Sequence, residues 1–370
     1  MNIIKDSLDL IGNTPLLLVK NLDTGPCNLY LKLESFNLGG SIKDRPAKNM
    51  IIEAEKKGLL RKGGTIVEAT AGNTGIALAI MAVKRGYKVV IIVPDKMTIE
   101  KVYHLKALGA EVIVARSDVV NGHPEYYLEI AKKIAKERKA FYINQFSNQA
   151  NIKSHIKDLG PEIYKQLNGK IHAFVAGVGT GGTISGIGKF LKSKNKKCEL
   201  VLADPKGSIL KDLIKTGKIN KNVGSWIVEG IGEDFCPPLL DTSLIDHAYS
   251  ISDFEAIDSC RKLLQNEGIL AGSSSGTLLA TALKFCKAQK VKKNVVTLIC
   301  DAGDKYLRKI YNESWRVKEG FNFKRKSNNL LDIVSNINSS RSIPIININS
   351  FCSLAFKLMH ENSVNFLLVE

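Results

Sequence analysis

Short apolar segments alternate with longer amphipathic segments along most of this chain, and that alternation limits its fold more than any other feature. The short segments, such as Thr65–Ala69 and residues 295–299, are rich in Val and Ile, which is typical of strands buried on both faces. Longer segments such as Asn73–Arg85 and Asp253–Glu267 have the periodicity of helices. The pattern predicts an α/β fold in which βα units surround mainly parallel sheets. Further strands are expected at residues 29–33, 89–93, 111–115, 173–176 and 200–203, and further helices at residues 98–108 and 154–167.

Composition excludes several classes of protein. The chain has 370 residues, 44% of them hydrophobic, and a formal net charge of +17. Its Lys and Arg residues are spread among Asp and Glu rather than grouped with aromatic residues, so we expect no nucleic-acid partner. The longest apolar run, residues 76–83, is too short to cross a bilayer, so no membrane association is expected. The seven Cys residues include no CxxC pair and the six His residues no HxxxH spacing, which predicts reduced thiols, no metal site and a cytoplasmic location.

A lysine follows two glycines at the start of one expected helix. In residues 39–45, GGSIKDR, the glycines permit a tight turn close to a ligand. Lys43 then meets the positive end of a helix dipole, which favours the neutral amine that Schiff-base chemistry requires. Taken alone, an ordinary surface lysine after a loop is the simpler interpretation.

Hydroxyl, amide and glycine residues fill the junction between strand Thr65–Ala69 and the helix after it. Residues 70–75 read TAGNTG. In open α/β sheets, ligands bind at such carboxyl ends of strands, and a helix start offers N–H groups to a carboxylate. A helix cap followed by a tight turn explains the same residues equally well.

A glycine-rich loop in mid-chain allows two functions. Residues 177–183, GVGTGGT, contain G-x-G-x-x-G, and Asp204 lies 22 residues beyond the last of those glycines. That spacing matches the dinucleotide fingerprint, so a nicotinamide-dependent dehydrogenase is one alternative. The loop is not in a first βα turn, however, and the hydroxyls of Thr180 and Thr183 suit a phosphate monoester better.

A fourth loop, residues 271–276 (AGSSSG), also joins a strand to a helix. Its serines either cap the helix or give a hydroxyl to a heteroaromatic nitrogen. The four loops together supply an amine anchor, a phosphate cradle and several polar groups, without a Ser/His/Asp triad or a cluster of metal ligands. We therefore expect a bound cofactor to carry the chemistry.

The order of these motifs resembles the cysteine synthase/cystathionine β-synthase family of fold-type II pyridoxal-phosphate enzymes. The resemblance covers about residues 5–320 and implies a tryptophan-synthase-β-like fold of two open, mainly parallel sheets flanked by helices. It implies pyridoxal 5'-phosphate as cofactor. It rests on GNTPL at residues 12–16, GSIKDR at 40–45, TAGNTG at 70–75, GTGGT at 179–183 and GSSSG at 272–276.

The resemblance also implies a role for each matching residue. Lys43 matches the Schiff-base lysine, which acts as general base and returns the proton. Asn73 matches the asparagine that bonds the cofactor's ring hydroxyl, and Ser274 the serine that faces the pyridine nitrogen. The phosphate loop corresponds to Gly179, Thr180, Gly181, Gly182 and Thr183. The substrate-binding residues correspond to Thr70, Gly72, Thr74, Gln145 and Gly230.

Several segments resemble the cystathionine β-synthase branch, notably residues 204–210 and 229–235. This implies that L-serine or O-acetyl-L-serine is condensed with L-homocysteine to L-cystathionine, in cysteine and transsulfuration metabolism. Phe146 stands where serine-using animal enzymes have Tyr, which keeps O-acetylserine open as the donor. The alternative is a cysteine synthase, an O-acetylserine sulfhydrylase that uses sulfide as the thiol.

The expected organisation has three parts. Residues 1–320 form a catalytic domain with a smaller subdomain at about 45–150, residues 321–330 a polar linker, and residues 331–370 an incomplete CBS-type (Bateman) regulatory motif. No haem is expected, because no haem-binding extension precedes the catalytic domain. A homodimer is expected from the family and from base rates.

Overall fold

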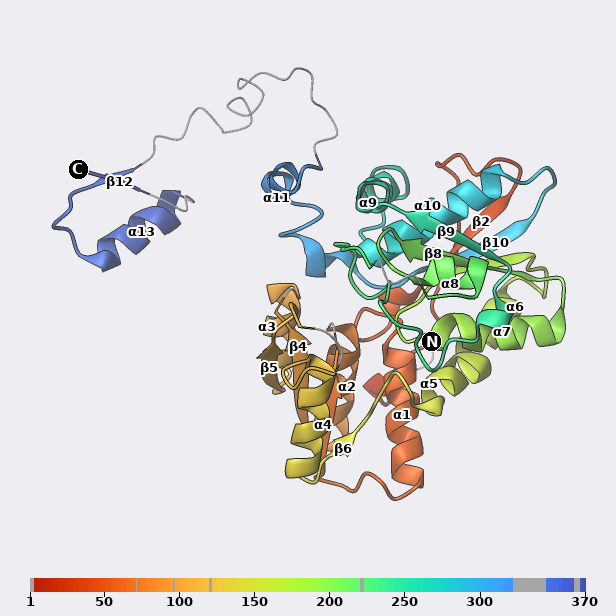
Figure 1. The fold of residues 1–370 in the computed structure, drawn as a ribbon, viewed down its shortest axis with the longest axis horizontal. Helices are drawn as coiled ribbons and strands as arrows, with labels where there is room; N and C mark the ends of the chain where they lie inside the picture. The colour runs from red at the N-terminus through yellow and green to blue at the C-terminus, as the bar shows by residue number, and fades with distance from the viewer. Residues whose placement is uncertain are drawn as a thin grey trace, which may run out of the picture. The chain divides into compact units, whose positions relative to one another are not determined.

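The computed structural model describes residues 3–70, 72–95, 97–119, 122–219, 223–321, 344–362 and 367–370. The chain divides into two compact units, Met1–Trp315 and Arg316–Glu370. Figure 1 shows the first unit as two bodies of strands and helices, one of which contains β4, β5 and β6 and the other β8, β9 and β10. Each body is built around its own sheet.

The larger sheet has six strands in the order β1-β2-β10-β7-β8-β9. Only β1 is antiparallel to its neighbour, and the other strands run parallel. Side chains from these strands and from the helices around them form one buried core, which includes Leu31, Phe174 and Leu202. The strands are β1 Leu16–Leu18, β2 Asn28–Leu33, β7 Ala173–Gly177, β8 Glu199–Pro205, β9 His247–Ile251 and β10 Asn294–Ile299.

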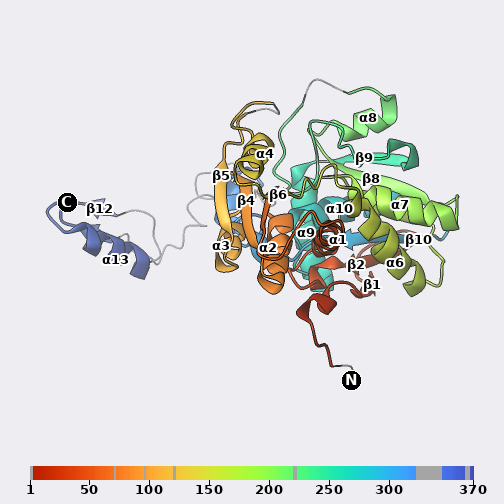
Figure 2. The same ribbon diagram turned by 90° about the horizontal axis from the view of Figure 1, so that it is seen from below.

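The smaller sheet has four parallel strands in the order β5-β4-β3-β6. Successive residues of a strand face opposite sides, so Ile66 packs into the core beneath α1 and α2 while Val67 packs against α4. Figure 2 shows these strands with α4 on one side and α2 and α3 on the other. The strands are β3 Thr65–Ala69, β4 Lys88–Pro94, β5 Glu111–Ala115 and β6 Phe141–Tyr142.

Local signals fix the ends of several helices. Helix α2 ends at Arg85 and is capped by Gly86, whose left-handed φ of 76° suits glycine. Helix α9 begins with a capping box, in which Ser252 and Glu255 each bond the other's backbone N–H. The helices of the first unit are α1 Asp44–Lys56, α2 Asn73–Arg85, α3 Ile99–Ala107, α4 Tyr127–Glu137, α5 Gln149–Ser154, α6 Gly160–Gln166, α7 Gly182–Lys194, α8 Leu210–Thr216, α9 Asp253–Glu267 and α10 Ser273–Lys287, and α11 Glu313–Lys318 crosses into the second.

The structure confirms the predicted α/β fold of two open, mainly parallel sheets flanked by helices. One expected helix, residues 154–167, is divided into a π-helical turn, His155–Leu159, and α6. Strands β1, β6 and β9 were not predicted from the sequence. Strand β6 has only two residues, and β9 lies at a sheet edge and buries only two of its five residues, so neither gives a continuous apolar run.

In the second unit, β11 (Ile345–Ile346) pairs in parallel with β12 (Leu368–Val369), and α13 (Cys352–Asn362) lies between them in the chain. The predicted linker, residues 321–330, lies outside the described residues except for Phe321. The assignment of residues 331–370 to a CBS-type motif stays a prediction. None of the helices that the structure describes has the length and hydropathy needed to cross a bilayer.

Candidate active site

One cavity gathers residues from four loops that are far apart in the sequence. Lys43 caps the start of α1, Asn73 is the first residue of α2, and Ser274 is the second residue of α10. The loop between β7 and α7 supplies the glycines. The predicted site residues that line this cavity are Lys43, Asn73, Gly179, Thr180, Gly181, Thr183, Gly230 and Ser274.

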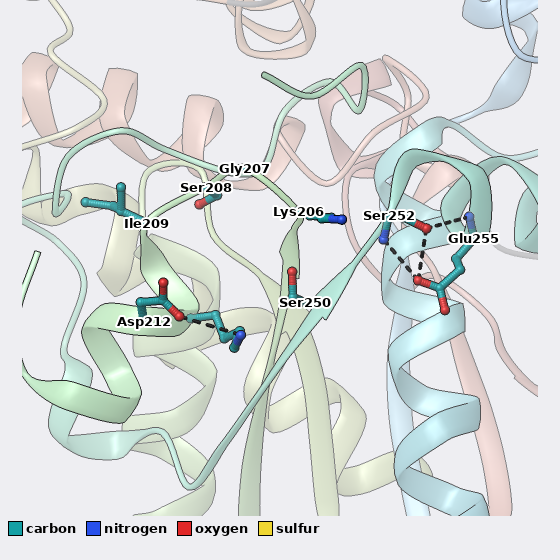
Figure 3. Close-up of a pocket in the computed structure, with 9 residues that line it drawn as sticks. Lys206, Gly207, Ser208, Ile209, Asp212, Ser250, Ser252 and Glu255 are labelled. Carbon is teal, nitrogen blue, oxygen red and sulfur yellow. Dashed lines mark hydrogen bonds and ion pairs between the residues drawn. The ribbon is translucent and has the colours of Figure 1, made fainter. Parts of the chain in front are cut away.

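A wider and more open pocket lies at the carboxyl ends of β8 and β9 (Figure 3), yet it contains none of the predicted site residues. Its lining includes Lys206, Ser208 and Ser250. Ser252 and Glu255 in this pocket bond each other as the cap of α9. We therefore place the chemistry in the narrower cavity, which is lined by the amine of Lys43, the amide of Asn73 and the hydroxyl of Ser274.

The surroundings of Lys43 favour its neutral amine. Burial lowers the pKa of Lys43, and the nearby carboxylates of Asp301 and Glu233 offset this only in part. The backbone just before Lys43 is held in place, because the Ile42 N–H donates to the Cys300 carbonyl at 2.8 Å. The position at the start of α1 agrees with the sequence analysis. Lys43 is thus held at the cavity with a lowered affinity for its proton.

The Asn73 amide has two partners on its buried side. Its Nδ2 donates to Asp301 Oδ2 at 2.7 Å, and its Oδ1 accepts from Lys305 Nζ at 3.4 Å. Both partners come from the segment that follows β10, which ends at Ile299. The side chain is therefore fixed in orientation while it remains part of the cavity lining.

The glycine loop is closely packed against its neighbours. Gly181 has a left-handed φ of 82° and caps the start of α7. A Cβ at Gly182 would lie 2.3 Å from Asn151 Oδ1, so only glycine fits there. Thr180 Oγ1 accepts from Asn151 Nδ2 at 3.0 Å, and Thr183 Oγ1 lies 3.2 Å from His155 Nε2. Burial lowers the pKa of His155 to about 3, so its ring is neutral beside the loop.

The predicted substrate-binding residues of the smaller sheet form their own group. Thr74 Oγ1 donates to Gln145 Oε1 at 2.8 Å, and Gln145 Nε2 donates to the Ala69 carbonyl at 3.0 Å. The Gly72 N–H donates to Thr70 Oγ1 at 3.1 Å. The structure brings these residues together at the carboxyl end of β3, but they are not among the residues that line the cavity.

Ser274 lies between two serines that hold backbone groups. Ser273 Oγ accepts from the Glu229 N–H at 3.0 Å, and Ser275 Oγ accepts from the Cys300 N–H at 2.9 Å. Of the three, only Ser274 is part of the cavity lining. Cys300 also lines the cavity, and burial raises the pKa of its thiol to about 12, so the thiol is protonated.

A buried polar network beside the cavity was missed by the sequence analysis. Lys101 Nζ lies 2.6 Å from Glu229 Oε2 and 3.0 Å from the Tyr306 hydroxyl. The Tyr306 hydroxyl donates to Asp301 Oδ2 at 2.7 Å, and Lys309 Nζ lies 2.8 Å from Glu229 Oε1. Asp301 and Tyr306 follow β10 as the other site loops follow their strands. That position was a usable signal, although the loop lacks the Gly/Ser/Thr pattern of the others.

Comparison with known proteins identifies the family. A model of the pyridoxal-phosphate dependent enzyme family matches residues 8–301. The chain belongs to this family. Membership argues against the nicotinamide-dependent dehydrogenase that the glycine motif alone allowed, and it confirms pyridoxal 5'-phosphate as the cofactor.

Individual relatives narrow the chemistry. The chain is 42% identical over 323 residues to a cystathionine beta-synthase of Apis mellifera, which covers 86% of this chain and 64% of that protein. It is 40% identical over 311 residues to an O-acetylserine dependent cystathionine beta-synthase of Bacillus subtilis, which covers 84% of this chain and 98% of that protein. A crystal structure of a hydrogen sulfide-producing enzyme from Fusobacterium nucleatum matches with a TM-score of 0.76 and 38% identity, over 82% of this chain and 100% of that one. The chain thus spans less than two thirds of the Apis protein.

The residues on the cavity fit this cofactor. An amine suits its aldehyde, an amide and a serine hydroxyl suit the polar groups of its ring, and the start of the 13-residue helix α7 suits its phosphate. A Cβ at Gly179 would lie 2.6 Å from the Gly230 carbonyl oxygen. Glycine therefore lets the loop backbone pack closely against Gly230 on the cavity lining, where a side chain would not fit.

Proposed function

We propose that this chain catalyses a β-replacement in which L-serine or O-acetyl-L-serine condenses with L-homocysteine to give L-cystathionine. A pyridoxal-phosphate β-replacement in sulfur amino-acid metabolism is what its family and relatives have in common. The observation that carries the finer proposal is the match to a cystathionine beta-synthase along 98% of the Bacillus protein. Lys43, Asn73 and Ser274 on one cavity supply the groups that this reaction needs.

Lys43 is the proposed catalytic residue. When bound, pyridoxal phosphate withdraws electrons from the substrate's α-carbon, which makes the α-proton acidic and lets the β-substituent leave. Lys43 Nζ anchors the cofactor and, once released by the substrate amine, takes up the α-proton and later returns it. Its lowered pKa increases the fraction of neutral amine that both tasks require.

The other cavity residues are proposed to hold and orient the cofactor. Gly179, Thr180, Gly181, Gly182 and Thr183 are proposed to bind the phosphate with backbone N–H groups and two hydroxyls. Asn73 is proposed to donate to the ring oxygen. Ser274 is proposed to meet the pyridine nitrogen with a neutral hydroxyl, which leaves that nitrogen less firmly protonated than a carboxylate would, and so favours loss of the β-substituent over racemisation or transamination.

The carboxylate of the amino-acid substrate is proposed to bind at the start of α2. Thr70, Gly72, Thr74 and Gln145 are grouped there by hydrogen bonds. Gly230, from a separate segment of the chain, also lines the cavity. Its φ is 86°, and no atom of the described residues lies within 4 Å of the place that a Cβ would take. This open space suits the passage of the substrate side chain.

The acetylated donor is favoured by one neighbouring residue. Phe146 follows Gln145 and packs against Phe235, with ring centroids 5.7 Å apart. Its ring has no group that could donate a proton to a departing hydroxide, whereas acetate leaves without that help. The dependence of the Bacillus relative on O-acetylserine, stated in its name, agrees with this preference.

A second candidate is a cysteine synthase that uses sulfide as the thiol. It is favoured by the likeness to a hydrogen sulfide-producing enzyme, because a site that releases sulfide also accepts it in the reverse direction. The two candidates differ in whether the thiol pocket accepts the longer homocysteine side chain.

A competition assay tests both candidates. The purified full chain with pyridoxal phosphate is supplied with differently labelled serine and O-acetylserine, together with homocysteine and sulfide, and the products are identified by mass. We expect labelled cystathionine, and its label names the donor. Cysteine as the sole product would instead establish the second candidate.

The proposal extends to the assembly and location of the protein. We propose a cytoplasmic homodimer, because two-fold dimers are the commonest soluble oligomers, and a regulatory role for residues 331–370. Sedimentation of the full chain at several concentrations tests the dimer. A monomeric mass at the highest concentration would contradict it.

A further inference from the structure

Three polar side chains lie almost fully buried behind Asn73 and have no part in the chemistry described so far. Asp301 is 1% exposed, Tyr306 2% and Lys305 5%. They belong to one short segment, since the 3₁₀ turn Gly303–Tyr306 follows β10 after three residues. Burying two charges is costly unless each is paired and hydrogen-bonded, so their contacts indicate what they do.

The contacts decide which way the Asn73 amide points. An amide has an acceptor oxygen and a nitrogen with two N–H donors. Asn73 Nδ2 donates to Asp301 Oδ2 at 2.7 Å, while Asn73 Oδ1 faces the Lys305 ammonium at 3.4 Å. Turning the amide over would place oxygen against a carboxylate and NH₂ against an ammonium. The second N–H of Nδ2 is consequently the group that Asn73 offers to the cavity.

Asp301 is itself held from two sides. The Tyr306 hydroxyl donates to its Oδ2 at 2.7 Å. On the other side, a Cβ added to Gly272 would lie 2.0 Å from Asp301 Oδ1, so the carboxylate is packed directly against the glycine backbone. Asp301 Oδ1 is buried without a hydrogen-bond partner among the described residues, so the two bonds to Oδ2, from Tyr306 and from Asn73, are what hold the acceptor in place.

Lys305 connects the same amide to the loop that precedes Lys43. Its Nζ donates to the Gly39 carbonyl at 3.0 Å and to the Gly40 carbonyl at 3.2 Å, in addition to Asn73. One ammonium therefore sets the position of two loops on the cavity. Burial lowers the pKa of Lys305, and the nearby Asp301 carboxylate opposes that shift and favours the charged ammonium.

We propose that Asp301 is a positioning residue which, together with Lys305, orients the Asn73 amide as a hydrogen-bond donor to the ring oxygen of the cofactor. That oxygen is electron-rich and needs a donor, so an amide turned the other way would repel it. The inference rests on the proposed assignment of Asn73 to the cofactor.

The test measures cofactor binding to the full chain without any amino-acid or thiol substrate. Apoenzymes of Asp301→Asn, Asn73→Ala and the double variant are titrated with pyridoxal phosphate, and both the apparent dissociation constant and the visible absorption band are recorded. We expect Asp301→Asn to weaken binding about tenfold or more, in line with a bond to a charged group, and to shift the band. The matched control is Asp304→Asn, an exposed carboxylate in the same turn, which should change neither quantity.

The double variant separates orientation from general damage. If Asp301 acts through Asn73, adding Asp301→Asn to Asn73→Ala has no further effect on binding or on the band. Additive effects, or an Asp301→Asn protein with wild-type binding and absorption, would overturn the inference. If Asp301→Asn does not fold, Lys305→Met provides the same comparison from the other side of the amide. An Asn73→Ala protein with unchanged binding and absorption would instead refute the assignment of Asn73 itself.

Discussion

Lys101 Nζ lies 2.6 Å from Glu229 Oε2, and this ion pair joins helix α3, which lies beside the smaller sheet, to the segment that leads into Gly230. The side chains of Lys101 and Glu229 are only 1% and 12% exposed. A buried pair of this kind adds little net stability compared with apolar side chains, but removing one partner strands the other charge. The pair therefore ties the two bodies of the first unit together beside the cavity.

Breaking that pair from one side should destabilise the fold. Glu229→Gln leaves the Lys101 ammonium buried without a counter-charge, and we expect the free energy of unfolding to fall by about 3 kcal/mol. Urea unfolding of the apoenzyme measures the change. The single variant Lys101→Met and the double variant Lys101→Met/Glu229→Gln are measured in the same way, and the double variant should recover part of the loss. A double variant whose loss of unfolding free energy equals or exceeds the sum of the two single losses would contradict this account.

Replacing Lys43 should remove catalysis. Lys43→Ala lacks the amine that anchors the cofactor and moves the α-proton, so we expect kcat to fall by at least about a hundredfold, the lower end of what a general base contributes. Steady-state product formation with saturating cofactor measures it. Lys57→Ala, just past the end of the same helix, is the matched control and should keep wild-type turnover. Near-normal activity in Lys43→Ala would refute the proposed function.

The neutral group at Ser274 should control which reaction occurs. Ser274→Asp places a carboxylate against the pyridine nitrogen, and we expect β-replacement to slow about tenfold or more while racemised or transaminated substrate appears. Chiral chromatography of the reaction mixture detects these products. Ser274→Ala removes the hydroxyl without adding charge and should produce no such side products. Unchanged turnover of Ser274→Asp without new products would count against the hypothesis.

Glu68 makes stability fall as pH rises. Burial raises the pKa of Glu68 from 4.5 to about 8, so between these values the folded chain keeps a proton that the unfolded chain has lost. The free energy of unfolding then decreases with rising pH, by up to about 1.4 kcal/mol per pH unit from this group. Glu68→Gln cannot ionise and should lack this contribution. Urea unfolding of both proteins at pH values from 5 to 8 compares them, and a constant difference between the two would contradict the prediction.

Local signals predicted much of the fold. Strand β3, strand β5 and helices α2 and α9 have the bounds that apolar periodicity and flanking glycines indicated. The order of strands in each sheet could not be read from the sequence, because pairing depends on contacts between distant segments. The π-helical turn at His155 was also missed, since it has the composition of an ordinary helix.

The candidate site was predictable where each loop has a recognisable composition of its own. Loop composition and the family resemblance together singled out Lys43, Asn73, the glycine loop and Ser274. The structure places these residues, apart from Gly182 of the loop, on the lining of one cavity, and their roles stay predictions. Asp301 and Lys305 were not found, because an acidic and a basic residue after a strand are common on protein surfaces. Their burial and their contacts with Asn73, more than 200 positions earlier, distinguish them from such surface residues.

The contact between Gly272 and Asp301 restricts how this protein can evolve. A methyl group at position 272 would overlap the Asp301 carboxylate, since its Cβ would lie 2.0 Å from Oδ1. Alanine at position 272 would therefore force the Asp301 carboxylate and also the Tyr306 ring, whose Cε2 would lie 2.7 Å from the new Cβ, to move. On the role proposed for Asp301, that movement would weaken cofactor binding. Selection for holding the cofactor thus preserves a glycine that supplies no functional group of its own.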